Sequence, residues 1–364
     1  MEQRIIISQQ LNRELATALS ECEHDKIFVL TDENTHEKCW PVISQFFSMR
    51  DAIVITIPAS DTHKSLESTA NVWKTMSEQG GSRHSCLINL GGGMVTDLGG
   101  FAASTFKRGM NFINIPTTLL AMVDASVGGK TGINFGELKN EIGVFSDSLF
   151  VILDTEFLTT LDQENLLSGY AEMLKHSLLA TEKMWAEHLN YPIAQFHDHT
   201  DSLVITQHLA EMIRESVEVK ERIVREDPNE KGIRKALNLG HTFGHAFESW
   251  SLRRSHEGVS STPILHGYAV AYGLICELYL SAVKCGFPTD KMRQTVNFIR
   301  ENYGRLPITC DDYGDLIQLM MHDKKNMSGI INFTLLGGIG DIRINQTATV
   351  DEIKEALDFL REGC

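Results

Sequence analysis

Short apolar runs alternate with amphipathic segments through the first 160 residues of the chain. The runs lie at residues 26–30, 52–57, 86–90, 112–115 and 149–153. Runs of this length and composition are typical of buried strands, and the intervening segment 65–76 has apolar positions at helical spacing. This alternation predicts an α/β domain with a mainly parallel sheet that is covered by helices.

The second half of the chain has a different pattern. Long segments at 164–189, 201–224, 234–250 and 266–284 have apolar residues three and four positions apart, which is typical of helices. Alternation typical of a strand is nearly absent until residues 330–336. We therefore predict an α/β domain over residues 1–161 and a mainly helical, essentially all-α, domain over residues 162–364.

Composition and charge narrow the range of functions. The chain has 364 residues, of which 42% are hydrophobic and 22% charged, as in ordinary soluble globular proteins. Its net charge of −15 disfavours binding to nucleic acid or to anionic membranes, so an anionic ligand requires a local basic pocket. The seven cysteines are scattered without a Cys-x-x-Cys pair, and the apolar burst near the N-terminus is short. These features predict a cytoplasmic protein with reduced thiols.

A glycine-rich turn, GGGMVTDLGG, follows the apolar run 86–90 at residues 91–100. Glycines between a strand and a helix let backbone amides approach a pyrophosphate. Thr96 stands at the third glycine position of the dinucleotide fingerprint, so a tight turn without a ligand also fits this segment. The segment GGKTG at 128–132 is not a P-loop, because Asp124 replaces the required glycine. Asp124 itself is either a helix cap or an active-site group.

Two histidines, His241 and His245, are four residues apart and so lie on one side of a predicted helix. Asn238 and Glu248 are expected on that same side. The spacing suits a metal site as well as a structural pair, and Thr242 excludes the zinc-protease motif, which requires Glu at that position. His266 begins the next helical segment and could complete a mixed metal shell.

Some charged residues occupy positions where the helical pattern calls for apolar ones. Lys220 lies on an apolar stripe, so we expect it to face a cleft that holds an anion. Glu172 and Lys175 are one turn apart, and such a pair taken alone is more often a solvated helix face. Arg234 precedes His241 by seven residues and is expected on the same helix face.

Longer motifs occur in a fixed order along the chain. They read GGGMVTDLGGF at 91–101, KRG at 107–109, IPTTLL at 115–120, VDASVGGKT at 123–131, KN at 139–140, AEMLK at 171–175 and LNLGHTFGH at 237–245. Together, from about residue 32 to DKKN at 323–326, they resemble the 3-dehydroquinate synthase family of sugar-phosphate cyclases. The resemblance implies an NAD-binding domain, then a metal- and substrate-binding domain, in a homodimer.

The reaction that the resemblance implies belongs to the shikimate pathway of aromatic amino acid biosynthesis. It converts 3-deoxy-D-arabino-heptulosonate 7-phosphate to 3-dehydroquinate and phosphate. NAD oxidises a hydroxyl transiently, phosphate is eliminated, the ketone is reduced again, and an intramolecular aldol step closes the carbocycle. Such an enzyme is a lyase with no net redox change.

The resemblance also assigns site residues, position by position. The implied ligands of the metal, Zn²⁺ or Co²⁺, are Glu172, His241 and His266, while His245 faces the substrate. The implied NAD-binding residues are Asp32, Asn34, Asp61, Lys64, Gly92, Gly93, Met94, Val95, Thr96, Asp97, Thr117, Thr118, Lys130, Lys139, Phe157 and Thr160. The implied substrate-binding and catalytic residues are Asp124, Lys130, Asn140, Lys175, Lys220, Arg234, Asn238, His245 and one of Lys324 or Lys325, with Arg108 reaching the phosphate in the partner subunit.

The chain departs from the family pattern at two places, and two other functions are also compatible with its motifs. Asp61 replaces the family's usual Glu, and the residues 251–263 look like an inserted surface loop. Another NAD- and metal-dependent sugar-phosphate cyclase would share the apparatus, and a metal-dependent polyol dehydrogenase would share the fold. Arg234, Asn238 and His245 suit a substrate with a carboxylate and favour the dehydroquinate reaction.

Overall fold

The computed structural model describes residues 3–136, 138–191, 193, 202–256, 258, 262–321 and 330–363. The chain divides into two compact units. The first comprises Met1–Asp162 with Asp201–Val217, and the second comprises Gln163–Thr200 with Glu218–Cys364. The predicted domain boundary after residue 161 stays a prediction.

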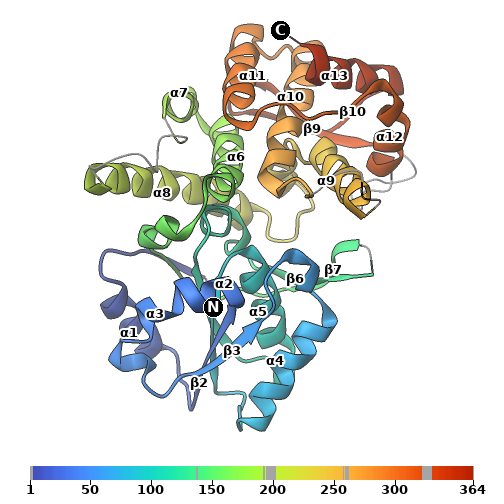
Figure 1. Cartoon of the computed structure of the whole chain (residues 1–364). Helices are drawn as coiled ribbons and strands as arrows, with labels where there is room; N and C mark the ends of the chain where they lie inside the picture. Colours follow the sequence, from blue (N-terminus) through green and yellow to red (C-terminus); the bar gives the residue numbers. More distant parts are fainter. Residues whose placement is uncertain are drawn as a thin grey trace. The chain divides into compact units, whose positions relative to one another are not determined.

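A six-stranded sheet forms the centre of the first unit (Figure 1). Its order is β1(Arg4–Ile7), β8(Phe150–Leu153), β5(Asn111–Pro116), β4(Cys86–Gly91), β2(Ile27–Asp32) and β3(Ile53–Ile57), and all neighbouring strands are parallel. The five predicted strands and the parallel sheet are confirmed. β1 at the sheet edge was not predicted, because its four residues are only partly buried.

Helices and a hairpin surround this sheet. The main helices are α1(Leu11–Glu21), α2(Glu33–Lys38), α3(Trp40–Ile43), α4(Leu66–Glu78) and α5(Gly93–Thr105). Short helical turns are η1(Phe47–Met49), η2(Asp61–His63), η3(Phe106–Arg108), the π-turn η4(Ala121–Ala125) and η5(Thr155–Thr160), and the antiparallel hairpin consists of β6(Lys130–Phe135) and β7(Leu138–Phe145). Phe28, Leu87 and Leu98 belong to one buried core that joins the sheet to α4 and α5.

The strand order reverses direction beside β4. After β2 the chain adds β3 on one side, and it then returns to place β4 on the other side of β2. Adjacent crossovers therefore leave the carboxyl ends of β2 and β4 in opposite directions. In open parallel sheets, such a switch point is where ligands bind.

The second unit is built mainly from helices. They are α6(Gln163–Ala180), α7(Glu182–Asn190), the C-terminal part of α8(Ser202–Glu226), η7(Ile233–Asn238), α9(His241–His256), α10(His266–Cys285), α11(Thr289–Tyr303), η8(Cys310–Asp312), α12(Tyr313–Met321) and α13(Val350–Glu362). The helical prediction is confirmed, the strand pattern at residues 330–336 corresponds to β9(Asn332–Gly338), and the unpredicted β10(Asp341–Thr347) pairs with it in an antiparallel hairpin.

The prediction of one continuous helix over residues 234–250 is confirmed only from His241 onward. The structure has a 3₁₀ turn, η7, which is followed by Gly240 at φ +80° and then by α9. A positive φ cannot continue a right-handed helix, so Gly240 separates the two elements. Arg234 and Asn238 therefore lie outside the helix of His241 and do not share its face.

Helix α10 is long and apolar enough to cross a membrane by length and composition alone. Its mean hydropathy is 1.2 over an 18-residue window, and 67% of that window is buried. It contacts α6, α9, α11, α13 and β9 and carries the buried carboxylate of Glu277. These features are typical of a core helix.

Candidate metal and dinucleotide sites

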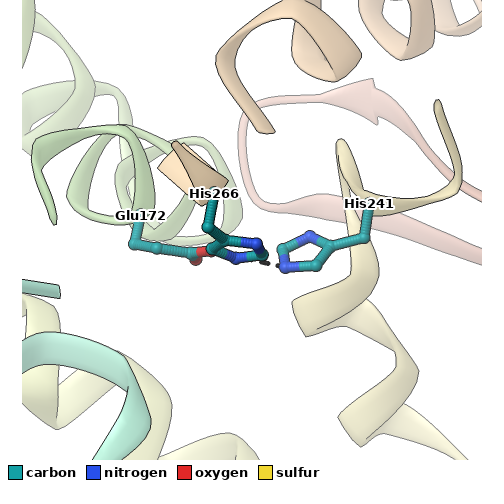
Figure 2. A group of neighbouring side chains, drawn as sticks. All are labelled: Glu172, His241 and His266. Atoms are coloured by element: carbon teal, nitrogen blue, oxygen red, sulfur yellow. Dashed lines mark hydrogen bonds and ion pairs between the residues drawn. The ribbon is translucent and has the colours of Figure 1, made fainter. Parts of the chain in front are cut away.

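Three helices of the second unit bring Glu172, His241 and His266 together (Figure 2). Glu172 lies in the middle of α6, whereas the histidines are the first residues of α9 and α10. Oε1 of Glu172 is 3.3 Å from Nε2 of His241 and 3.2 Å from Nε2 of His266. The three possible ligand atoms lie within 4.8 Å of one another. Two imidazoles and a carboxylate are a donor set that suits Zn²⁺ or Co²⁺.

The other ring nitrogen of each histidine is held by an acceptor. Nδ1 of His241 is 3.1 Å from the carbonyl oxygen of Leu239, and Nδ1 of His266 is 3.1 Å from Oε2 of Glu248. When Nδ1 donates to these acceptors, Nε2 of both rings is available as a ligand. The residues present therefore fit a divalent metal.

Close backbone contacts place these helices. A Cβ on Gly267 would lie 1.8 Å from the carbonyl oxygen of Ser168 in α6, so α10 begins directly against α6. The amide of Gly267 also donates to Oγ of Ser168 at 3.1 Å. At Gly244 of α9 the approach is less close, because a Cβ there would lie 3.2 Å from the carbonyl oxygen of Ala269 in α10. Glycines adjoin the histidines because only a missing side chain permits this spacing.

The Glu172–Lys175 ion pair is buried, so interpreting it as a solvated helix face is wrong. The side chains are 0% and 1% exposed, and the Lys175 ammonium contacts Oε2 of Glu172. Burial alone would raise the pKa of Glu172, but Lys175, together with His241 and His266, lowers it well below its usual range. Glu172 is therefore a carboxylate and can serve as a ligand.

The pKa of His266 is also perturbed. Burial acts to lower it, but Glu248 and Glu172 raise the pKa of His266 to about 10. The metal-free site thus attracts a positive charge between its two carboxylates. A bound metal ion would replace the proton on this ring.

His245 lies one turn beyond His241 on α9. Its ring centroid is 5.4 Å from that of His241, at an edge-to-face angle of 88°, and 6.4 Å from that of His266. Among the described residues, the metal-type cluster around Glu172 and His241 contains His266 and not His245. The role that the family resemblance gives to His245, to face the substrate, stays a prediction.

Predicted anion-binding residues of this unit are largely buried. Lys220 in α8 is 6% exposed and Arg234 in η7 is 2% exposed. Nη1 of Arg234 donates to the carbonyl oxygen of Pro228 at 2.6 Å, and Asn238 donates to Glu230 at 3.0 Å. Buried cations of this kind require anionic or polar partners.

The glycine-rich turn lies at the switch point of the sheet in the first unit. Gly92 is the N-cap of α5, and Gly93 to Asp97 form the first turns of that helix. A Cβ on Gly92 would lie 3.0 Å from Cγ2 of Thr118, so a residue other than glycine would crowd Thr118. Asp32 caps α2 at the end of the adjacent strand β2, and Asn34 follows it. Backbone amides at such a helix start can bind a pyrophosphate.

Other predicted cofactor residues form a polar network in the same unit. Lys64 is 4% exposed and donates to Asp97 and to Asn140, each at 2.5 Å. Nζ of Lys139 lies 3.4 Å from Oδ2 of Asp61, so an acidic side chain still stands at the position where the family usually has Glu. Thr117 follows β5, and its amide donates to Gly91 at 3.0 Å. Thr160 and Phe157 lie in η5, where the Thr160 hydroxyl donates to the carbonyl oxygen of Phe157 at 2.7 Å.

The remaining predicted residues are placed individually. Asp124 lies in the π-turn η4, Lys130 is the exposed first residue of β6, and Arg108 is exposed at φ +70°. Lys324 and Lys325 lie outside the described residues. The predicted surface loop over residues 251–263 is wrong in its first part, because residues 251–256 continue α9, and residues 257 and 259–261 lie outside the described residues.

Sequence reasoning missed two supporting carboxylates. Glu248 was predicted to lie on the same helix side as His241 and His245, but no function was predicted for it. Its partner His266 is 18 residues away in the sequence, so the pairing could not be predicted from helical spacing. Oδ2 of Asp227 accepts hydrogen bonds from the amides of Gly232, at 2.6 Å, and Arg234, at 3.1 Å. Its position before a Pro in a polar loop was the only available signal.

Comparisons with known proteins agree with this geometry. A family model described as 3-dehydroquinate synthase N-terminal matches residues 54–168, and one described as 3-dehydroquinate synthase C-terminal matches residues 169–326. The chain is 51% identical to 3-dehydroquinate synthase of Parabacteroides distasonis, covering 100% of this chain and 99% of the relative. It is 34% identical to the Corynebacterium diphtheriae enzyme, covering 98% and 95%.

Solved structures have the same fold. A 2-epi-5-epi-valiolone synthase from Streptomyces hygroscopicus subsp. jinggangensis, with NAD⁺ and Zn²⁺ bound, matches with a TM-score of 0.82 at 25% identity, covering 99% of this chain and 97% of the other. A 2-deoxy-scyllo-inosose synthase with carbaglucose-6-phosphate, NAD⁺ and Co²⁺ has a TM-score of 0.79 at 21% identity, covering 99% and 96%.

Proposed function

The chain belongs to the 3-dehydroquinate synthase family, and from this premise we propose how its residues carry out the reaction. Its function is that of a lyase, the conversion of 3-deoxy-D-arabino-heptulosonate 7-phosphate to 3-dehydroquinate and phosphate with NAD and a divalent metal.

Glu172, His241 and His266 would hold the divalent metal. The metal would supply a Lewis acid that lowers the pKa of a substrate hydroxyl. Lys175 keeps Glu172 ionised, and Leu239 and Glu248 orient the two imidazoles. His245, one turn further along α9, is available to exchange a proton with the substrate.

NAD would bind at the switch point of the parallel sheet. The amides at the start of α5 would contact the pyrophosphate, and Asp32 and Asn34 would lie beside the cofactor at the end of β2. The chemistry that bound NAD would supply is a reversible hydride acceptor. Lys64, Asp97 and Lys139 would contribute polar contacts from their network.

The substrate carries a phosphate and a carboxylate, so a chain with a net charge of −15 needs buried cations to bind it. Lys220 and Arg234 would bind the carboxylate, and Lys175 would contact a hydroxyl near the carbon that is oxidised. Asn238 and His245 complete the proposed substrate contacts of this unit. Family resemblance supports adding Asp124, Lys130, Asn140 and one late lysine.

We also propose a cytoplasmic homodimer. Among the described residues no cysteine forms a disulfide, which supports a reducing compartment. Phe135, Leu138 and Phe145 on the β6–β7 hairpin are 55–58% exposed, and such apolar exposure supports burial against a second copy. The exposed Arg108 would reach the phosphate bound by the partner subunit.

The convergence of Glu172, His241 and His266, in a chain that matches the family over its full length, carries this proposal. The test is phosphate release from the heptulosonate phosphate with substoichiometric NAD. We expect many turnovers per NAD, loss of activity in the His241→Ala variant and in chelator, and recovery with Zn²⁺ or Co²⁺. Stoichiometric accumulation of NADH would instead indicate a polyol dehydrogenase, and turnover of only a carboxylate-free sugar phosphate would indicate another cyclase.

A further inference from the structure

Glu277 is a carboxylate in the middle of α10, a long and mostly apolar helix of the second unit. Its side chain is 0% exposed, and its neighbours Cys276 and Leu278 are equally buried. Burying an ionisable group is costly unless strong hydrogen bonds compensate. Its presence in α10 therefore calls for a specific partner.

Its partners are the backbone amides on either side of His241. Oε2 of Glu277 accepts from the amide of Gly240 at 2.6 Å, and Oε1 accepts from the amide of Thr242 at 3.1 Å. The first N–H groups of a helix have no partner within the helix, and its positive end favours a carboxylate. Glu277 supplies that cap to α9 from another helix, and the residue before α9, Gly240, has no side chain that could do so.

The same two helices touch backbone to backbone at this point. Gly240 has φ +80°, and a Cβ on Gly273 would lie 1.9 Å from the carbonyl oxygen of Gly240. The turn before His241 is thus held by α10 through a close glycine contact and through both oxygens of Glu277. This turn also contains the Leu239 carbonyl that faces Nδ1 of His241.

Helix α10 therefore helps to place two of the three proposed metal ligands, His266 and His241. It begins with His266, and eleven residues later, about three turns, Glu277 fixes the start of α9. We propose that Glu277 is a positioning residue for the metal centre, which sets the direction of Nε2 of His241 relative to His266 and Glu172. This inference rests on the proposed metal site.

The test compares Glu277→Gln with a matched control in the same helix. Glutamine has the same shape, but its NH₂ group would face a backbone N–H, so one cap hydrogen bond is replaced by a donor-donor contact. Glu277→Asp keeps the charge on a shorter side chain and serves as the conservative variant. Cys276→Ala is the control, because Cys276 is equally buried but faces Ala356 of α13.

Two readouts separate positioning from stability: the Co²⁺ affinity of each folded variant, and the visible absorption of the Co²⁺-loaded protein. Glu277→Gln should weaken Co²⁺ binding about 10- to 100-fold, as expected for loss of a group that orients a ligand, and should change the absorption band. Cys276→Ala should lower the melting temperature while leaving both readouts unchanged. Glu277→Asp should recover part of the affinity.

The outcomes distinguish this proposal from the proposed function. If Glu277→Gln, or Glu277→Asp should the glutamine variant not fold, binds Co²⁺ with parental affinity and an unchanged band, Glu277 has no positioning role. If Cys276→Ala weakens Co²⁺ binding as much as Glu277→Gln, the effect is general destabilisation, which also overturns the proposal. Failure of His241→Ala to weaken Co²⁺ binding would instead refute the metal site itself.

Discussion

The carboxylate of Glu248 lies 3.1 Å from Nδ1 of His266, and so joins the middle of α9 to the first residue of α10. An imidazole that binds a metal through one nitrogen is oriented by the partner of the other. The pair also links two helices that each supply a histidine to the cluster. Removing the carboxylate should therefore affect metal binding more than folding.

We expect Glu248→Ala to weaken Co²⁺ binding about 10- to 100-fold, because His266 loses the acceptor that orients it. The measurement is competition with a chromogenic chelator at constant pH. Ser249→Ala, at an exposed position of the same helix, is the control. A folded Glu248→Ala protein with parental Co²⁺ affinity would contradict this role.

A double-mutant cycle should measure the interaction between Glu172 and Lys175 in their buried ion pair. Lys175→Met leaves Glu172 as a buried carboxylate without its ammonium, so the free energy of unfolding of the metal-free protein should fall by about 3–5 kcal/mol. Adding Glu172→Gln should restore part of this loss. The measurement is equilibrium unfolding in urea, and strictly additive effects of the two substitutions would argue against the pairing.

The start of α10 should not tolerate a side chain at Gly267. A Cβ there would lie 1.8 Å from the Ser168 carbonyl oxygen, so Gly267→Ala must move α10 away from α6. We expect a loss of about 1–3 kcal/mol in the free energy of unfolding, and weaker Co²⁺ binding because His266 moves too. Gly314→Ala is the matched control, since nothing lies within 4 Å of its added Cβ. Equal behaviour of the two variants would refute the close approach.

Asp227 should make the free energy of unfolding of the protein depend on pH, through its hydrogen bonds to the amides of Gly232 and Arg234. Partial burial acts to raise the pKa of Asp227, but hydrogen bonds from the amides of Gly232, Lys231 and Arg234 lower it below 3.8. A carboxyl whose pKa is lower in the folded state stabilises the fold at pH values above its unfolded pKa, and this contribution is lost as the pH falls through the folded pKa.

Asp227→Asn should consequently be less stable than the parent at pH 7, and the difference should shrink below about pH 4. Urea unfolding of both proteins at a series of pH values measures this difference. Asp51→Asn, at an exposed position, provides the comparison. A difference that stays constant from neutral to acid pH would exclude a role for the Asp227 charge.

Much of the fold follows from local patterns. The strands β2, β4 and β5 were predicted because a parallel strand covered on both faces must be apolar along its whole length. Helices α4, α8 and α10 were predicted from apolar residues at helical spacing. Strand β7 was not predicted, because all of its residues are exposed and no buried face imposes an alternation.

The sequence by itself determined the α/β and helical halves, the family and the candidate side chains for the chemistry, since these depend on residue type and on spacing along the chain. Only the tertiary structure decided that Glu172, His241 and His266 meet, that Gly240 separates η7 from α9, and that Glu277 caps the helix of His241. Each of these depends on contacts between residues far apart in the chain. Such contacts are set by close helix packing and by the need of buried polar groups for partners, which leave no periodic trace in the sequence.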